Sequence, residues 1–501
     1  MNDTPGTKFL SLLRNPVSYL GLVVACVSAG IGIPMMLLDM LAGSGNAYMG
    51  MMIYLVLPGT GVGGVILACA GMWWEDRRRA RGGQALPLPR LDLNDARDRL
   101  VAAVSLAVAV AVAASLSVAG YRAYHFTESV AFCGKLCHEV MKPEHTAYQF
   151  SAHARVACVS CHVGEGAGWF VRSKLSGLYQ VYSVTFNKFS RPIKTPVHSL
   201  RPAQETCENC HWPAKFFGGV QKTFTHRISD EKNTPWQAQM LIKVGGGDPS
   251  TGASGGIHWH MNIKNKVFYA SDASRESIPW VRVVGPDDKS TEYTTTEAPP
   301  SAEELAKMPV RRMDCVDCHN RPSHIYKPAD RVVDGAFESG GLDASLPFLK
   351  REAVRLLAAS YAAESEALAS IRKGLPEYYA KNHPKVVEQK SEAVQVAAET
   401  VARLFSAYVF PEMKTDWRVH PNHAGHRDSD GCYRCHDGLH KSPDGRVVTK
   451  SCDACHTVLA QGAPQEVARA RLSAQAFKHP VEGVDVVEMK CGMCHNGAPG
   501  L

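Results

Sequence analysis

Residues 132–174 read FCGKLCHEVMKPEHTAYQFSAHARVACVSCHVGEGAGWFVRSK, and they decide how the rest of the chain is interpreted. The stretch contains Cys133-Gly-Lys-Leu-Cys137-His138 and Cys158-Val-Ser-Cys161-His162. A cysteine pair followed at once by histidine is the attachment signature of c-type haem, in which both thiols bond to the porphyrin and the histidine ligates the iron. Because an apolar segment ends just before this stretch, the sequence predicts two covalent haems beside a membrane.

The same signature recurs further along the chain. Fourteen of the 16 cysteines form seven close pairs, and histidine follows each pair directly. Disulfides in an oxidising compartment are the alternative, but they require no following histidine. Six motifs have two intervening residues and the first has three, and together they predict seven covalently attached c-type haems. The predicted attachment cysteines are Cys133, Cys137, Cys158, Cys161, Cys207, Cys210, Cys315, Cys318, Cys432, Cys435, Cys452, Cys455, Cys491 and Cys494, and the motif ligands are His138, His162, His211, His319, His436, His456 and His495.

Three apolar segments precede the motifs. Residues 16–41, 49–74 and 100–120 are each long enough to cross a bilayer as helices. Cys26 and Cys69 lie inside the first two segments, where we expect them to be small buried hydrophobes. A cleaved signal peptide, with lipoprotein processing at Cys26, is the alternative for the first segment. The apolar run continues well past Cys26, which favours a retained helix.

Basic residues predict the orientation of these helices. Lys8 and Arg14 precede the first segment and EDRRRAR (75–81) follows the second, whereas the loop 41–48 contains neither Lys nor Arg. The positive-inside rule then places the N-terminus in the cytoplasm and the chain beyond residue 121 outside. The sequence therefore predicts a protein of the bacterial inner membrane with a periplasmic haem domain. The formal charge of +7 is modest and indicates no nucleic-acid partner.

The polar part divides by composition. Residues 264–271 and 279–284 are predicted strands beside a glycine-rich loop (245–256), and 345–409 carry helical periodicity. The predicted fold is a membrane-anchored multihaem cytochrome c, with three N-terminal transmembrane helices and a mainly α-helical or irregular, haem-packed domain with a small β-rich insertion. The predicted parts are a membrane anchor (1–120), a three-haem module (121–225), the β-rich insertion (226–310), a fourth haem segment (311–344), a helical hairpin (345–410) and a C-terminal three-haem module (411–501).

Each iron requires a second axial ligand to become six-coordinate, the state that suits electron transfer. Fourteen histidines outside the motifs are enough for seven irons. His258 and His260 stay open as candidates, since they share one face of a predicted strand. The predicted second ligands are Met141, His153, His226, His324, His423, His426, His440 and His479.

Several segments resemble the NapC/NirT family of membrane-anchored multihaem cytochromes, which oxidise quinol. The resemblance covers 132–324 and rests on FC…CHEVM after a membrane helix, HARVACVSCH, WFVRSK, LRPAQETCENCH and CVDCHNRPSH. The whole layout, with seven motifs and a C-terminal PNHAGH…GCYRCH segment, resembles the heptahaem inner-membrane branch of that family. Metal-respiring bacteria use that branch to pass menaquinol electrons toward extracellular acceptors.

The resemblance implies roles for three residues. Met141 corresponds to the distal-type ligand of the membrane-proximal haem, with His145 as the alternative because the first motif is one residue longer. Lys174 corresponds to the lysine of the quinol pocket, where its ammonium would hydrogen-bond a quinol oxygen. His324 corresponds to a ligand of a neighbouring haem. The family's acidic partner a short distance after the lysine has no counterpart, because positions 180–181 are Gln and Val.

The resemblance thus implies a quinol dehydrogenase that oxidises membrane quinol, in particular menaquinol, and passes electrons to periplasmic c-type cytochromes in anaerobic or metal respiration. Family members usually have one anchor helix, so the two extra spans either pair with a partner or shape the quinol entrance. An oligomer is also possible. Two alternatives stay open. One is a terminal reductase of nitrite or another nitrogen or sulfur oxide, with one open iron. The other is an electron-transfer subunit fed by a separate quinol enzyme.

Overall fold

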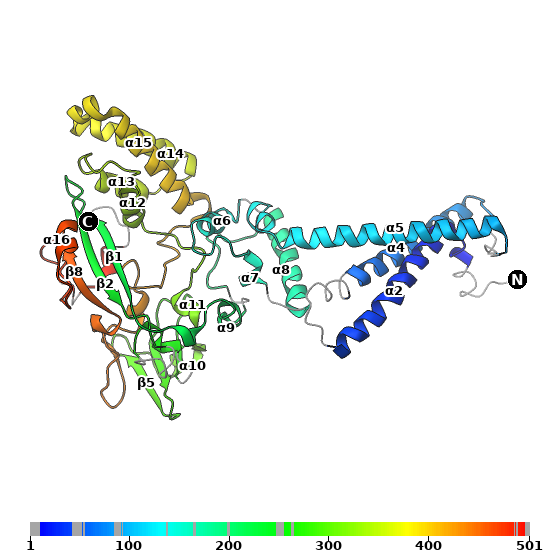
Figure 1. Ribbon diagram of the computed structural model, residues 1–501, viewed down its shortest axis with the longest axis horizontal. Coiled ribbons are helices and arrows are strands. Elements are labelled where there is room, and N and C mark those ends of the chain that lie inside the picture. The colour runs from blue at the N-terminus through cyan, green and yellow to red at the C-terminus, as the bar shows by residue number, and fades with distance from the viewer. Residues whose placement is uncertain are drawn as a thin grey trace. The chain divides into compact units, whose positions relative to one another are not determined.

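A computed structural model describes most of the chain, and its elements carry the labels of Figure 1. The chain divides into two compact units, residues 1–133 with 163–179, and residues 134–162 with 180–501. Cys137 and His138 of the first motif, and most of the glycine-rich loop, lie outside the described residues. The described residues are 11–42, 53, 56–84, 92, 94–136, 139–163, 167–197, 201–246, 255–261, 265–484, 486 and 489–495.

The described part of the first unit contains three helices that are long and apolar enough to cross a membrane. They are α2 (Pro16–Ala42), α4 (Leu57–Ala80) and α5 (Ala96–Thr127) (Figure 1). The prediction of three membrane spans is therefore confirmed, with the third helix extending further than the apolar segment alone predicts.

Small residues allow α2 and α4 to pack closely. A Cβ added at Gly21 would lie 2.4 Å from the backbone nitrogen of Ala68, so a larger residue would force the helices apart. Ser28 and Thr60 also hydrogen-bond across this interface at 2.6 Å. Close approach and interhelical hydrogen bonds are the interactions that hold membrane helices together.

The expectation for Cys26 and Cys69 is wrong. Both side chains are exposed on the outer surface of their helices rather than buried. The reason is that glycine, alanine and serine occupy the α2–α4 interface, which leaves the two cysteines on the faces that a bilayer would cover.

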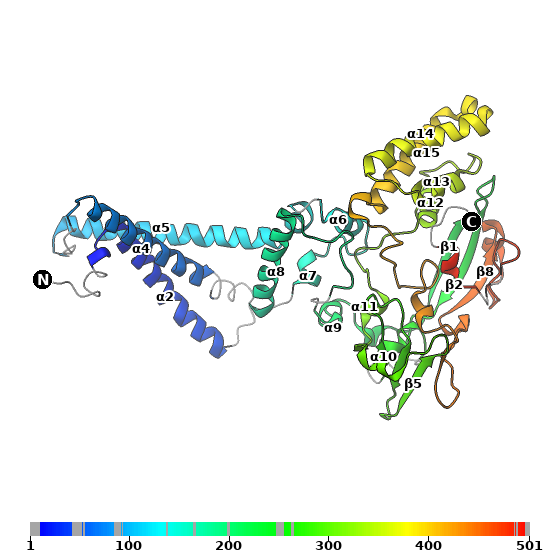
Figure 2. The ribbon, with the colours of Figure 1, turned by 180° about the vertical axis from the view of Figure 1, so that it is seen from behind.

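Two antiparallel sheets form the β part of the second unit, and each contains a strand from the C-terminal segment. The first has the order β1-β2-β8 (Figure 2). The second has the order β6-β3-β4-β5-β7. The predicted strands correspond to β3 and β4, whereas β1 and β2 were not predicted. The strands are β1 (Val220–Arg227), β2 (Pro235–Ile242), β3 (Lys266–Ala270), β4 (Trp280–Val284), β5 (Ser290–Thr295), β6 (Val310–Arg312), β7 (His440–Lys441) and β8 (His456–Gly462).

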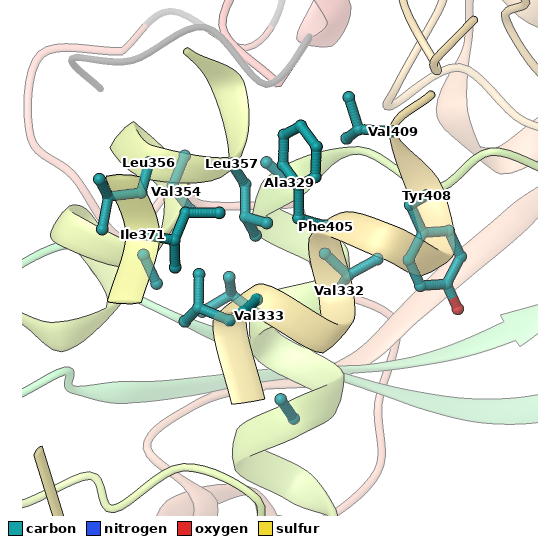
Figure 3. Packing of buried hydrophobic residues seen from close by; sticks show 14 of the residues in the cluster. Ala329, Val332, Val333, Val354, Leu356, Leu357, Ile371, Phe405, Tyr408 and Val409 are labelled. Carbon is teal, nitrogen blue, oxygen red and sulfur yellow. The ribbon is translucent and has the colours of Figure 1, made fainter. Parts of the chain in front are cut away.

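Four helices build the main hydrophobic core of the second unit. They are α12 (Ala329–Glu338), α13 (Leu349–Ala358), α14 (Glu364–Asn382) and α15 (Pro384–Tyr408). Figure 3 shows residues of this core, including Leu357, Ile371 and Phe405, which are fully or almost fully buried. The predicted helical segment 345–410 is therefore helical, and it packs with α12 as a four-helix cluster.

Short helical turns complete the fold, and several carry the haem motifs. His258 and His260 lie on one of these turns, the 3₁₀ helix η5, so the strand predicted there is wrong. The turns and short helices, with the longer α8, are η2 (Phe132–Leu136), α6 (Lys142–Gln149), α7 (Cys158–His162), α8 (Ala167–Thr185), α9 (Ala203–Cys207), η3 (Pro213–Lys215), η5 (Ile257–Met261), α10 (Ala302–Lys307), α11 (Cys315–Cys318), η6 (Pro411–Met413), η7 (Gly431–Arg434), η8 (Cys452–Ala454), α16 (Pro464–Arg469) and η9 (Cys491–Met493).

Candidate haem and quinol sites

The second to seventh haem motifs, which the structure describes completely, fold as short helical turns. In the fourth motif, Asp314 caps the turn α11 by accepting a hydrogen bond from the Val316 amide at 3.0 Å. The His319 amide then donates to the Cys315 carbonyl at 2.8 Å, and His436 makes the same bond to the first cysteine of its own motif at 3.0 Å. The turn therefore brings both cysteines and the histidine of a motif together, as covalent haem attachment requires.

Six motif histidines each lie beside a second histidine from another part of the chain. A metal–imidazole nitrogen bond of roughly 2 Å on each side of an iron would place two ring centroids about 6 Å apart. The observed centroid distances are 5.7 to 6.4 Å, which fits two imidazoles that share one iron. The pairs are His153–His211, His162–His324, His258–His319, His260–His436, His426–His456 and His479–His495.

Backbone carbonyls hold several of these partner histidines by Nδ1. The Nδ1 of His258 contacts the Val244 carbonyl at 2.7 Å, and that of His324 contacts the Glu144 carbonyl at 3.0 Å. His153 makes the same kind of contact with the Pro322 carbonyl at 3.2 Å. A carbonyl that accepts from one ring nitrogen fixes the tautomer and leaves the other nitrogen for a metal.

Burial keeps many of the paired imidazoles neutral. It lowers the pKa of His324 to about 4, despite the opposing effect of the Glu144 carbonyl. A neutral imidazole has the lone pair that a metal requires. Burial also lowers the pKa of His162, His260, His319, His426 and His456.

His226, His423 and His440 were predicted as iron ligands, but their ring nitrogens contact other groups. His226 lies between Asp334 and Arg427, at 3.2 Å and 3.1 Å. The Nε2 of His423 lies 2.9 Å from Glu276. These contacts argue against the sequence-based assignment of both residues as iron ligands.

His440 has contacts at both ring nitrogens. Its Nδ1 lies 2.9 Å from Asp437 and its Nε2 lies 2.8 Å from the Ile278 carbonyl. Both partners are acceptors, so the ring needs both of its protons. Burial opposes this charged form, but the hydrogen bonds to Asp437 and Ile278 outweigh it and raise the pKa of His440. An imidazolium has no lone pair for iron, which argues against the predicted ligand role.

The first motif is described only in part. A Cβ at Gly134 would lie 2.2 Å from Cδ2 of His145, so the ring of His145 packs directly against this motif. Met141 precedes helix α6 and is half-buried. The structure thus places the alternative ligand His145 against the motif, and both candidates belong to the second unit.

Lys174 has an acidic partner, which the sequence did not indicate. Its Nζ lies 3.3 Å from Oε1 of Glu128 and donates to Oγ1 of Thr127 at 3.0 Å. Glu128 directly follows α5, whereas Lys174 lies on α8, and both belong to the first unit. The carboxylate therefore comes from the end of the third membrane helix, and not from the positions after Lys174 where the family resemblance places it.

Two comparisons with known proteins identify the family of this chain. Residues 96–205 match the NapC/NirT cytochrome c family, N-terminal region. The chain is also 42% identical over 494 residues to the cytochrome c-type protein ImcH of Geobacter sulfurreducens, which covers 98% of this chain and 97% of that protein. This chain belongs to the NapC/NirT cytochrome c family. No solved structure matches it significantly.

Family membership makes the protein an inner-membrane-anchored cytochrome with covalently bound haem that acts in electron transport. The matched region 96–205 includes α5, the first two motifs, Glu128 and Lys174. Sequence reasoning left His258 and His260 open and missed Glu128. Their partners lie far away in the sequence, and the only local signal was that two histidines lie two positions apart beside a glycine-rich loop.

Proposed function

We propose that this NapC/NirT cytochrome carries seven haems and oxidises membrane quinol beside Lys174 and Glu128. The ion pair between these two side chains is the observation that carries the proposal, because it joins a hydrogen-bond donor and a proton acceptor at the end of a membrane helix. Electrons then leave toward periplasmic c-type cytochromes. Menaquinol is the proposed donor, as the family resemblance implies.

The surroundings of Lys174 support access from lipid. Val171, Leu175 and Leu178 lie on the same helix, and their side chains are exposed although they are apolar. Such a surface suits the acyl region of a bilayer or the ring and tail of a quinol. Lys174 is partly exposed beside it, with 37% of its side chain accessible.

The chemistry of the site requires proton acceptance, because a quinol that becomes a quinone loses two electrons and two protons. The ammonium of Lys174 would donate a hydrogen bond to one quinol oxygen, and the carboxylate of Glu128 would accept a proton. When bound, the haems supply one-electron acceptors. Met141, or His145 beside the first motif, is the proposed ligand of the first haem.

Paired histidines support the relay. We propose that His153, His324, His426 and His479 complete the coordination of the haems whose motif histidines they face. Two ligands per iron suit electron transfer, whereas a reductase needs an open iron, so the pairs favour a relay over a terminal reductase.

The N-terminal end of the anchor supports the proposed orientation. Arg79 contacts Glu75 at 2.8 Å and Ser11 at 2.8 Å, so the arginine cluster lies beside Ser11, shortly before α2 begins. Positive charge at this end of helices α2 and α4 favours the cytoplasmic side of the membrane for that end. The haem domain would then lie in the periplasm.

The proposal is tested by replacing the pair. Glu128→Gln removes the proton acceptor and Lys174→Gln removes the cation, so reduction by a quinol analogue should slow by roughly 10²–10⁴-fold for Glu128→Gln. Haem content and reduction by dithionite should not change. Asp98→Asn, at the other end of α5, and Lys188→Gln, beyond the end of α8, are matched controls. Unchanged quinol kinetics in both pair variants would exclude this site.

A further inference from the structure

The turn η5 carries two paired histidines at positions only two residues apart. His258 faces His319 of the fourth motif, with centroids 6.4 Å apart and ring planes within 14° of each other. His260 faces His436 of the fifth motif at 5.7 Å. The fourth motif is the last of the first four motifs, and the fifth is the first of the three C-terminal motifs. One short turn therefore faces a motif of each group.

The 3₁₀ geometry explains how one turn serves two sites. With about three residues per turn, side chains two positions apart point roughly 120° away from each other. Trp259 lies between the two histidines and packs against the hydrophobic cluster of the second sheet. Cys435 of the fifth motif packs against the same cluster. The indole therefore anchors the turn, and the histidines diverge on either side of it.

The end of β2 fixes the backbone of this turn. The Ile257 amide donates to the Lys243 carbonyl at 2.8 Å, and the His258 amide donates to the Gly245 carbonyl at 3.1 Å. Gly246 has a φ of +120°, and a Cβ there would lie 2.3 Å from the Trp259 nitrogen. Only glycine allows this close approach, so the local sequence is built to hold the turn in place.

The two motifs that η5 faces also contact each other directly. Nη2 of Arg434, inside the fifth motif, donates to the Asp317 carbonyl of the fourth motif at 2.6 Å. Asp317 in turn accepts from the Tyr269 hydroxyl of β3 at 2.6 Å. The sheet, the two motifs and η5 therefore form one connected group of contacts.

We propose that η5 is a bridge between the two haem groups: His258 is the distal ligand of the haem attached to Cys315 and Cys318, and His260 is the distal ligand of the haem attached to Cys432 and Cys435. This inference rests on the proposed haem attachment at these two motifs, and it is independent of the quinol site. The β-rich insertion then has a defined role, because it supplies ligands to two haems whose motifs follow it in the sequence and lie more than 100 residues apart.

Carbon monoxide binding to the reduced, full-length protein tests the bridge. His258→Ala and His260→Ala should each add one CO-binding haem per chain over the parent, and the double variant should add two. Added imidazole should reverse the effect, which a merely misfolded site would not show. His383→Ala, at the end of α14, is the matched control and should add none. The proposal is overturned if neither single variant opens a haem, or if the opened haem does not respond to imidazole.

Removal of one attachment site assigns each ligand to its haem. Cys315→Ser/Cys318→Ser should abolish the CO site created by His258→Ala and retain the one created by His260→Ala. Cys432→Ser/Cys435→Ser should do the reverse, and the opposite pattern would overturn the pairing. Mass spectrometry counts the attached haems in each variant. A parent with fewer than seven haems contradicts the proposed function, whereas a seven-haem parent with unaltered CO binding in the variants contradicts only the bridge.

Discussion

The four-helix cluster α12–α15 and the haem-motif segments are stabilised in different ways. In the helices, large apolar side chains such as Leu349, Ile371 and Phe405 are completely buried against one another. Beside the motifs, buried residues are often polar, as His440 and Asp317 show, and the cluster around the second sheet contains four buried apolar residues in the described part of the chain. The comparison indicates that side chains alone form the helical core, whereas the motif segments rely on haem to complete theirs.

The largest expected effect comes from preventing haem attachment at the last three motifs by replacing their cysteines with serine. Residues 420–495 should lose protection from proteolysis, because the porphyrins supply apolar area that side chains there do not. Helices α13–α15 should stay protected. Limited proteolysis with mass spectrometry measures both, and equal loss of protection in the helices would break the comparison.

Shortening a side chain within the helical core should destabilise the helices and leave the haem-motif segments unchanged. Ile371→Ala should lower the free energy of unfolding of the helical region by roughly 2–5 kcal/mol, because it removes buried methyl and methylene groups and leaves a cavity. Denaturation followed by far-UV circular dichroism measures this loss, while the haem absorption should not change. Val396→Ala on α15 is the control, since Val396 is exposed and should have little effect. A changed haem spectrum in Ile371→Ala would show that the two regions are not separately stabilised.

A smaller effect should distinguish a histidine that faces a motif histidine from one that does not. His324→Ala should open one haem to carbon monoxide, because His324 faces His162 at a centroid distance of 6.2 Å. His423→Ala should open none, since its Nε2 contacts Glu276. Both histidines lie close to motifs in the sequence, so the pair of variants is well matched. An open haem in His423→Ala would restore the sequence-based assignment.

The smallest effect concerns pH. The folded protein raises the pKa of His440 above its unfolded value of about 6.5, so the protonated form stabilises the fold below that pH. This contribution is lost as the pH rises through the folded-state pKa. Thermal unfolding of His440→Gln should therefore show a weaker loss of stability between neutral and alkaline pH than the parent. An identical pH dependence would contradict the charged state assigned to His440.

Local sequence patterns predicted much of this architecture. The seven motifs, the three membrane helices, β3 and β4, and the helical segment after residue 345 all depend on residues close together in the chain. Glu128 and Lys174 are 46 positions apart on different helices, and no periodicity connects them. His440 follows its motif as closely as His324 follows its own, yet Asp437 and the Ile278 carbonyl occupy both of its nitrogens. Proximity to a motif therefore predicts that a histidine is available, and only the tertiary fold decides which iron, if any, it ligates.

An experimental structure of the haem-loaded protein would decide whether the paired histidines share irons, because it identifies both ligands of every iron. Six irons should each lie between a motif histidine and its paired histidine. The fourth haem should lie between His319 and His258, and the fifth between His436 and His260. An iron bound by His226, His423 or His440, or a pair divided between two haems, would contradict this assignment.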